Sequence, residues 1–362
     1  MTKSVIEKIA RQELIEMVPY LSARRLQAGG GDFDKKTWLN ANEASGSGNY
    51  QLDAKNINRY PDFQPESLIN AYASYADIKA SQLLATRGAD EGIELIIRTF
   101  CKAYQDNILI CPPTYGMYAI SAENHGAGIV KVPLINNELD VDGICQQVGK
   151  VNVVFLCSPG NPTGNLLPHA QIKAVIEAFA DSAMVVVDEA YIEFSPEATA
   201  ASWLSQYPNL IVLRTLSKAF ALAGLRCGFT IANDDVIHLI AKVIAPYPVP
   251  APIAELATNA LTPQGLSVMQ ARVKTTNQLK EDFIAWLNTQ TWCSDVFNSD
   301  ANFVLFRTEQ KTAIFDALIA NDILIRDQSK QQQLDNCLRV TIGSEAELTL
   351  VKQTITQMLQ NA

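Results

Sequence analysis

The 362-residue sequence lacks several features that would assign a chain to a large functional class. No apolar run approaches the length of a membrane span. Residues 1–17 mix charged and apolar side chains and lack the continuous apolar stretch of a secretory signal. A formal net charge of −9 argues against a surface for nucleic acid or anionic membrane. We therefore expect a cytoplasmic protein that holds any anionic ligand with a few local donors.

Cysteine and histidine are also too scattered to suggest a metal centre. The seven cysteines contain no Cys-x-x-Cys pair, and their odd number fits reduced thiols. The three histidines, at positions 125, 169 and 238, form no cluster with cysteines or paired carboxylates. No Gly-x-Gly-x-x-Gly segment follows an expected strand, which excludes the usual dinucleotide loop. We expect neither a catalytic metal nor a dinucleotide.

What the sequence does contain indicates an α/β protein of two domains. Apolar residues make up 48% of the chain and charged residues 19%, as in ordinary globular proteins. Between about residues 81 and 232, short β-rich runs alternate with helical patterns, which predicts βαβ units and a mostly parallel sheet. The expected strands are residues 82–86, 107–111, 128–133, 151–157, 183–187, 210–214 and 227–232.

A proline-rich connector follows this alternating region. Four prolines lie within residues 245–252, and they favour an extended chain. Beyond it we expect helices at 253–259, 265–288 and 345–359 and strands at 302–307, 323–326 and 337–342. The predicted organisation is an N-terminal segment (1–30) packing with the small domain, a large domain (31–250) and a small α+β domain (251–362).

Lys218 is the most informative single residue. It lies in Thr-Leu-Ser-Lys-Ala-Phe-Ala-Leu-Ala-Gly, residues 215–224, directly after an expected strand, and Arg226 follows eight residues later. A lysine that forms a Schiff base must lose its charge, and burial or nearby cations favour that loss. Taken alone, Lys218 has the simpler interpretation of a solvated surface lysine.

Three more expected strands end in polar loops that favour the chemical interpretation. Residues 87–92 (Arg-Gly-Ala-Asp-Glu-Gly) open a helix whose N–H groups suit a phosphate, although a plain turn capped by Asp90 explains them equally. Asn161 lies in a turn stiffened by two prolines and two glycines, a common composition for plain turns. Asp188 ends a buried apolar strand and needs a cationic partner, with Tyr191 three residues beyond. Such loops meet at one edge of a parallel sheet, so a single ligand site is expected there.

The order Asn161, Asp188, Tyr191, Lys218, Arg226 resembles that of the fold-type I pyridoxal-phosphate enzymes. The lysine segment resembles the signature of their class II aminotransferase branch. The resemblance implies a large domain with a mostly parallel seven-stranded sheet, a smaller α+β domain, and pyridoxal 5′-phosphate as cofactor. It implies that Lys218 binds the cofactor covalently and moves a proton, that Asp188 keeps the pyridine nitrogen protonated, and that Asn161 and Tyr191 hydrogen-bond the ring. The other implied cofactor contacts are Ala89, Asp90, Glu91, Ser217 and Arg226 around the phosphate, Tyr115 on the ring face, and Tyr60.

Longer segments resemble the histidinol-phosphate aminotransferases of histidine biosynthesis across roughly residues 18–343. They include Pro-Tyr-Leu-Ser-Ala-Arg-Arg (19–25), Trp-Leu-Asn-Ala-Asn-Glu (38–43), Arg-Tyr-Pro (59–61), Pro-Pro-Thr-Tyr-Gly-Met-Tyr (112–118) and Leu-Arg-Val-Thr-Ile-Gly (338–343). This resemblance implies transfer of the amino group of L-histidinol phosphate to 2-oxoglutarate, by a ping-pong route through pyridoxamine phosphate. It also implies a homodimer with shared active sites, in which Tyr60 reaches the cofactor phosphate of the other subunit. The alternative is that Tyr60 is a core or rim tyrosine within one subunit.

The same resemblance assigns the substrate pocket. Arg339 is expected to clasp the substrate phosphate with Arg326 as a second cation, because two guanidinium groups suit a dianion. Without the resemblance, both would be interpreted as surface arginines in salt bridges. Tyr20 and Asn42 are expected to line the same pocket. The alternatives are an aromatic or broad-specificity aminotransferase, a phosphothreonine-type decarboxylase, and a cofactor-binding regulator, for which no basic DNA-binding extension is present.

Overall fold

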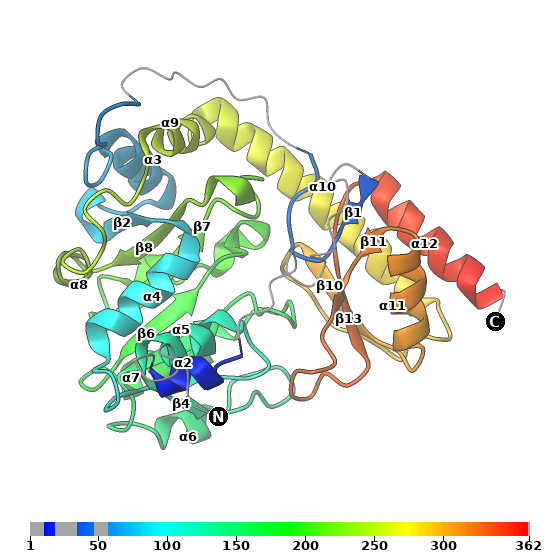
Figure 1. Ribbon diagram of the computed structural model, residues 1–362, viewed down its shortest axis with the longest axis horizontal. Helices are drawn as coiled ribbons and strands as arrows, with labels where there is room; N and C mark the ends of the chain where they lie inside the picture. The colour runs from blue at the N-terminus through cyan, green and yellow to red at the C-terminus, as the bar shows by residue number, and fades with distance from the viewer. Residues whose placement is uncertain (1–10, 19–34, 47–56, 361–362) are drawn as a thin grey trace, which may run out of the picture.

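The computed structural model describes residues 11–18, 35–46 and 57–360, and these form two adjoining domains (Figure 1). The large domain is built on a seven-stranded sheet in the order β2-β8-β7-β6-β5-β3-β4. Its strands are β2 (Leu83–Thr86), β3 (Asn107–Ile110), β4 (Gly128–Lys131), β5 (Val153–Cys157), β6 (Met184–Asp188), β7 (Leu210–Thr215) and β8 (Gly228–Ala232). All seven strands expected from the sequence are present, and their bounds shift by one or two residues.

The central strands consist almost entirely of apolar residues because helices cover both faces of the sheet. Every residue of β5, β7 and β8 is buried. One face packs on α3 (Glu66–Ala76), α7 (His169–Ala178) and α9 (Ala251–Ala260). The other packs on α4 (Gly88–Phe100), α5 (Met117–His125) and α8 (Asp234–Ile240). Strand β8 is antiparallel to both neighbours, and the remaining pairs are parallel, so the sheet is mostly parallel as expected.

The small domain contains an antiparallel sheet in the order β12-β13-β10-β9. These strands are β9 (Asp295–Val296), β10 (Phe303–Arg307), β12 (Arg326–Asp327) and β13 (Cys337–Thr341). The helices α10 (Pro263–Asn288), α11 (Lys311–Ala320) and α12 (Glu345–Gln360) pack around it, and α10 runs between the domains (Figure 1). Thr262 caps α10 by accepting a hydrogen bond from the Gly265 N–H at 3.2 Å, and Pro263 occupies the first helical position.

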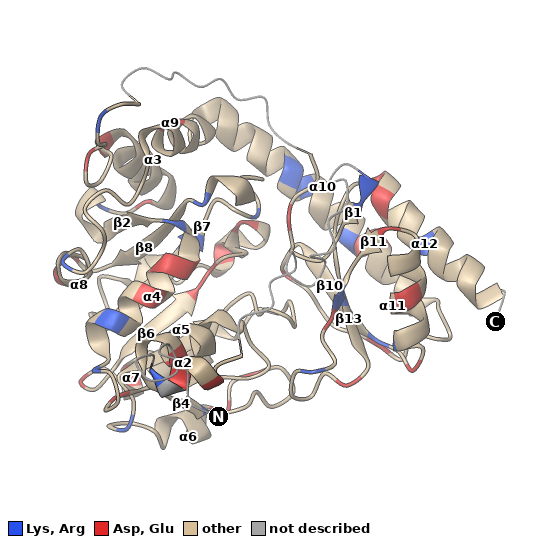
Figure 2. Ribbon diagram, viewed as in Figure 1, with Lys and Arg blue, Asp and Glu red and all other residues tan. Residues whose placement is uncertain are grey.

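The remaining described elements are short. They are α2 (Gln12–Glu16), α6 (Val141–Cys145) and the 3₁₀ helices η3 (Ala80–Gln82), η4 (Ile192–Phe194), η5 (Pro196–Ala198), η6 (Ala201–Trp203) and η7 (Ala223–Leu225). Charged side chains of both signs are spread over both domains (Figure 2). In the described parts of the chain, no helix is long and apolar enough to cross a membrane.

The border between the domains differs from the predicted one at both ends. Strand β1 (Thr37–Trp38) pairs in parallel with β11 (Ile323–Leu324), and Leu39 is buried in the core of the small domain. Residues 37–39 therefore belong to the small domain, because a backbone ladder and an apolar contact hold them there. Helix α9 contributes its alanines to the large-domain core, and so does Met269 of α10. The border therefore lies within α10, whose later residues Phe283 and Leu287 belong to the small-domain core.

The N-terminal segment also differs where it is described. The prediction packed residues 1–30 against the small domain, but residues 11–18 contact the large one. The Arg11 guanidinium lies 5.4 Å from the ring centroid of Tyr104 and donates to the Asn124 carbonyl oxygen at 3.0 Å. A cation over an aromatic face and a charge-assisted hydrogen bond stabilise this placement.

Candidate active site

A cavity of about 670 Å³ lies between the two domains at the carboxyl ends of β5, β6 and β7. Open parallel sheets bind their ligands at this edge. Most of the residues predicted for the site line this cavity, namely Asn42, Ala89, Asp90, Tyr115, Asn161, Asp188, Tyr191, Ser217, Lys218, Arg226, Arg326 and Arg339.

Asp188 supplies a buried carboxylate at the floor of the cavity. It is the last residue of β6 and is 3% exposed. Its Oδ1 accepts from the Ala190 N–H at 3.1 Å, and its Oδ2 accepts from the Tyr118 hydroxyl at 2.7 Å. Burial raises the pKa of Asp188 to about 6, although both hydrogen bonds oppose the rise. Such a carboxylate favours a cationic partner, for instance a protonated ring nitrogen.

Lys218 faces the same cavity from the loop after β7. Its Nζ donates to the Ala41 carbonyl oxygen at 2.9 Å and lies 5.6 Å from the ring centroid of Tyr191. Burial first, and the charge of Arg339 second, lower the pKa of Lys218 to about 8. A substantial neutral fraction near neutral pH makes this amine a nucleophile and a base.

A cradle for a phosphate forms where α4 begins. Arg226 donates from Nη1 to Ser217 Oγ at 3.3 Å and from Nη2 to Asp90 Oδ2 at 3.2 Å. A Cβ on Gly88, whose φ is +76°, would lie 2.7 Å from Arg226 Nη2, and one on Gly228 would lie 2.4 Å from the Gly88 carbonyl carbon. The two glycines therefore let a strand, a guanidinium and a helix N-terminus meet. This donor set fits a phosphate ester.

Tyr191 lies at the centre of a buried hydrogen-bond network. Its hydroxyl oxygen accepts from Asn42 Nδ2 at 2.9 Å and from Asn161 Nδ2 at 3.2 Å. Asn42 adopts a left-handed backbone (φ 55°), and its N–H donates to Thr341 Oγ1 at 2.9 Å. The small domain thus fixes one of the two amides that orient the Tyr191 hydroxyl. Tyr115, on the opposite side, donates to Asp90 Oδ1 at 2.9 Å.

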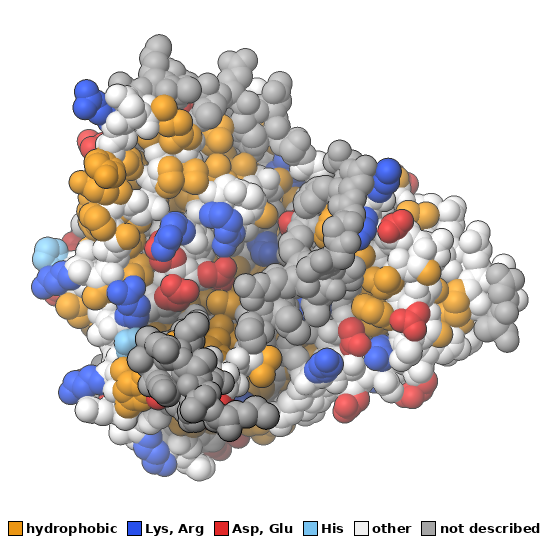
Figure 3. Space-filling model, in the orientation of Figure 1, with side chains coloured by type: hydrophobic (Ala, Val, Ile, Leu, Met, Phe, Trp, Pro, Cys, Tyr) orange, Lys and Arg blue, Asp and Glu red, His pale blue; other side chains and the backbone are white. Residues whose placement is uncertain are grey.

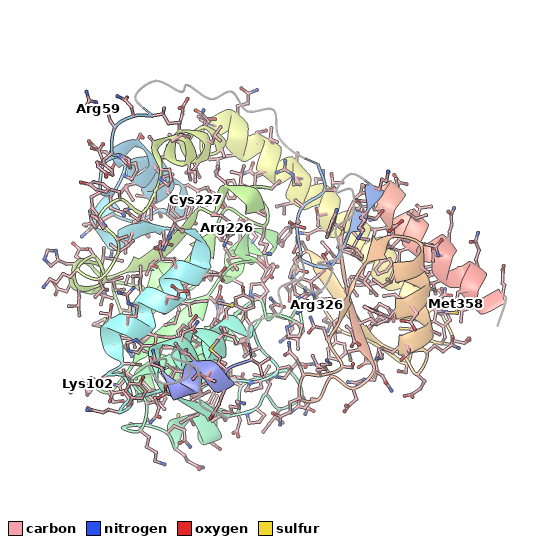
Figure 4. The ribbon with its side chains drawn as sticks, viewed as in Figure 1. Arg59, Lys102, Arg226, Cys227, Arg326 and Met358 are labelled. Carbon is pink, nitrogen blue, oxygen red and sulfur yellow. The ribbon has the colours of Figure 1, made fainter. Side chains whose placement is uncertain are left out.

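The two arginines predicted to read an anion lie next to each other. Arg326 on β12 is directly opposite Arg339 on β13 in the antiparallel register, so both side chains leave the same face. Arg339 is 6% exposed and donates to Asn161 Oδ1 at 2.6 Å and to the Asn40 carbonyl oxygen at 3.0 Å. Burial excludes the surface interpretation for Arg339. Figure 4 places Arg226 on the large domain and Arg326 on the small one.

Two predicted site residues that the structure describes, Glu91 and Tyr60, do not line the cavity. The Glu91 carboxylate accepts from the Arg87 N–H at 2.7 Å and from Arg87 Nε at 2.8 Å, so its side chain holds the first turn of α4. Tyr60 is 81% exposed and stacks on Tyr247, with ring centroids 4.5 Å apart. Tyr20 lies outside the described residues.

Sequence reasoning missed several residues at or behind the cavity. Glu43, Cys157, Gln328 and Gln331 line it, and none of them was predicted as a site residue. Tyr118 was also missed. It is the second residue of α5, donates to Asp188 Oδ2 and meets the Tyr115 ring edge-on.

Comparison with known proteins decides the family. The model for aminotransferase class I and II matches residues 26–355. A histidinol-phosphate aminotransferase of Colwellia psychrerythraea is 62% identical, over 97% of this chain and 99% of that protein. This chain belongs to the histidinol-phosphate aminotransferases of that class.

Solved structures agree with the fold of this family. The histidinol-phosphate aminotransferase of Clostridium acetobutylicum is 28% identical, with a TM-score of 0.79 over 85% of this chain and 92% of that one. The enzyme of Sinorhizobium meliloti, solved in complex with pyridoxal 5′-phosphate, has a TM-score of 0.83 over 98% of both chains at 22% identity. The seven-stranded sheet and smaller antiparallel domain are therefore the fold-type I architecture expected from the sequence.

Proposed function

We propose that this protein transfers the amino group of L-histidinol phosphate to 2-oxoglutarate, giving 3-(imidazol-4-yl)-2-oxopropyl phosphate and glutamate, with pyridoxal 5′-phosphate as cofactor. The observation that carries this proposal is the buried Arg339 beside Arg326, facing a cavity that also holds Lys218 and Asp188. The family membership supports the same assignment.

The described residues fit the cofactor at both of its ends. Arg226, Ser217 and the first turn of α4 would hold its phosphate, and Asp188 would pair with its protonated ring nitrogen. Tyr115 would contact one ring face, and Asn161 with Tyr191 would bind the ring oxygen. When bound, the cofactor supplies a ring that stabilises negative charge developing at the substrate α-carbon.

Lys218 performs two tasks in this proposal. Its partly neutral amine is the attachment point for the cofactor, because a pKa of about 8 leaves Nζ nucleophilic. The same Nζ would be the base that moves the proton at the substrate α-carbon. The hydrogen bond to the Ala41 carbonyl oxygen and the Tyr191 ring limit where this amine can swing.

The arginine pair provides substrate selection. A phosphate monoester presents a dianion, and Arg326 with Arg339 offers two planar forks from adjacent strands. A neutral substrate of the same shape would leave both guanidinium groups without that partner. The pair therefore favours a phosphorylated amine over an aromatic amino acid.

The deciding experiment is a steady-state assay of the purified enzyme with 2-oxoglutarate. We expect a kcat/KM for histidinol phosphate far above those for histidinol, phenylalanine and tyrosine. Comparable values for phenylalanine and histidinol phosphate would identify a broad-specificity aminotransferase instead. Release of carbon dioxide from phosphothreonine without any oxo acid would identify a decarboxylase.

We also propose a cytoplasmic homodimer in which Tyr60 completes the partner's cofactor site. Exposed apolar side chains gather around α3 and the chain that leads into it (Figure 3), among them Ile57, Phe63 and Tyr247 at 67%, 40% and 48% exposure. Such a patch is typical of a protein–protein interface. Tyr60 stacks on Tyr247, is 81% exposed and does not line the cavity of its own subunit. All seven cysteines are free, which suits a reducing compartment.

A further inference from the structure

Asp188 has a second partner in a residue that does not touch the cavity. Tyr118 is the second residue of α5, is fully buried, and donates its hydroxyl proton to Asp188 Oδ2 at 2.7 Å. The two residues are 70 positions apart in sequence and come from a helix and a strand. Tyr115, three residues earlier, lines the cavity, whereas Tyr118 lies behind it.

The Tyr118 ring is held on two sides, so its hydroxyl cannot turn away. It stacks on Phe155 of β5 with centroids 4.7 Å apart and planes 11° from parallel. Tyr115 meets it edge-on at 5.7 Å and 86°. A stacked ring loses its freedom at χ1 and χ2, which fixes the hydroxyl at one point.

The surroundings of Asp188 make the hydrogen bond from Tyr118 important for the charge state of the carboxylate. Among residues 11–18, 35–46 and 57–360, none forms a salt bridge with Asp188. Burial is the largest influence on its pKa and raises it, and the Tyr118 hydroxyl is the strongest influence that lowers it. The other groups that act on this site are the Ala190 N–H, which also lowers that pKa, and Asp90, Glu189, Cys157 and Tyr191. Burial keeps the pKa of Tyr118 well above its usual value, so the phenol remains a donor.

We propose that Tyr118 is a positioning residue that keeps Asp188 ionised and correctly oriented toward the cofactor ring nitrogen. Its hydroxyl donates to Oδ2, while the Ala190 N–H donates to Oδ1. The carboxylate plane is then fixed before any ligand enters, which is electrostatic preorganisation. The link to the cofactor rests on the proposed function, whereas the link between Tyr118 and Asp188 is a property of the apoprotein.

The apoprotein gives a test that is independent of turnover. The pKa of an unfolded aspartate is about 3.9, and burial raises the pKa of folded Asp188 to about 6. The folded state therefore keeps this proton bound up to a higher pH than the unfolded state does. The free energy of unfolding therefore falls as pH rises from about 4 to about 6. Tyr118→Phe removes only the hydroxyl and raises the folded pKa further. The difference in the free energy of unfolding between wild type and Tyr118→Phe must then grow with pH and be largest above pH 7.

Tyr72 provides the matched control. It is also fully buried and stacked on a phenylalanine, Phe229, at 3.6 Å, and its hydroxyl does not contact Asp188. We expect Tyr72→Phe to change the free energy of unfolding by an amount that is nearly independent of pH between 5 and 8. In an Asp188→Asn background, the change in the free energy of unfolding caused by Tyr118→Phe must no longer depend on pH, because the titrating carboxylate is gone.

The experiment is chemical denaturation of five apoproteins from pH 5 to pH 8, followed by equilibrium binding of pyridoxal 5′-phosphate. The five are wild type, Tyr118→Phe, Tyr72→Phe, Asp188→Asn and the Asp188→Asn/Tyr118→Phe double variant. At pH 8 we expect Tyr118→Phe to bind the cofactor about 10-fold more weakly than wild type and Tyr72→Phe to bind it normally, since a hydrogen bond to a charged group is lost. A stability loss in Tyr118→Phe that is the same at every pH would overturn the proposal. Should Tyr118→Phe not fold, 3,5-difluorotyrosine at position 118 retains the hydroxyl as a stronger donor, and it must shift the apoprotein titration to lower pH. Failure of wild type to transaminate histidinol phosphate would overturn the proposed function and leave the apoprotein result standing.

Discussion

Replacing Arg339 by alanine tests whether the small domain reads the substrate phosphate. The structure gives this side chain two kinds of contact to lose. Within the protein it donates to Asn161 Oδ1 and to the Asn40 carbonyl oxygen, at 2.6 and 3.0 Å. Toward a phosphorylated substrate it would add charge-assisted hydrogen bonds beside Arg326. Only the second kind depends on the substrate.

The two losses differ in expected size. A hydrogen bond to a charged group contributes about 1.5–3 kcal/mol, which corresponds to a roughly 10-fold to 200-fold fall in kcat/KM for histidinol phosphate. The bonds to Asn161 Oδ1 and to the Asn40 carbonyl oxygen also come from the charged guanidinium, but they form before the substrate binds, so their loss affects both substrates alike. Unphosphorylated histidinol loses only the contacts within the protein, so we expect the smaller factor for it.

The assay compares kcat/KM for the two substrates in wild type, Arg339→Ala and Arg307→Ala. Arg307 lies on the neighbouring strand β10, donates to the carbonyl oxygens of Asp335 and Gln333, and does not line the cavity. Arg307→Ala tests the effect of losing an arginine from the same sheet. In this variant, the ratio of kcat/KM for histidinol phosphate to kcat/KM for histidinol must stay at the wild-type value. Equal losses for both substrates in Arg339→Ala would refute the phosphate-reading role and leave Arg339 a structural residue.

Three further outcomes follow from the same site. Borohydride reduction of the enzyme with bound cofactor should label the Lys218 peptide. The rate at which the apoprotein binds the cofactor should rise with pH, with a midpoint of about 8. A midpoint near 10 would contradict the lowered pKa of Lys218. Asp188→Ala should still bind the cofactor but lose most of its turnover, because the buried partner of the ring nitrogen is gone; unchanged kcat would refute that role. Mixing Tyr60→Ala with Lys218→Ala subunits should restore part of the activity, since one site of each mixed dimer carries neither defect; no recovery after verified subunit exchange would show that Tyr60 acts within its own subunit.

Much of this architecture could be predicted because its signals are local. Strands such as β5 and β7 are apolar along their whole length, and the loops that follow carry Asn161 and Lys218. Residues 87–92 are expected to open a helix, and α4 begins among them at Gly88, before its apolar periodicity starts. The first turn of α4 contains Ala89 and Asp90, which line the cavity.

Features that depend on distant pairing could not be predicted in this way. The placement of residues 37–39 in the small domain comes from a ladder with Ile323 and Leu324, nearly 300 residues away, and no local pattern encodes it. Tyr118 likewise carries no charge or special turn in its sequence, and its importance appears only when α5 brings it to Asp188. The domain border and the residues behind the cavity therefore required the structure.

The contacts across the domain boundary connect substrate recognition with chemistry. Arg339 of the small domain donates to Asn161, and Asn161 donates to the Tyr191 hydroxyl in the large domain. Asn42 reaches the same hydroxyl, and the neighbouring Ala41 carbonyl accepts from Lys218. A phosphate bound by Arg339, as proposed, would therefore act on the groups that orient the reacting centre. Binding energy from that remote group would support the position of Tyr191 and Lys218, so we expect a substrate without phosphate to lose kcat as well as affinity.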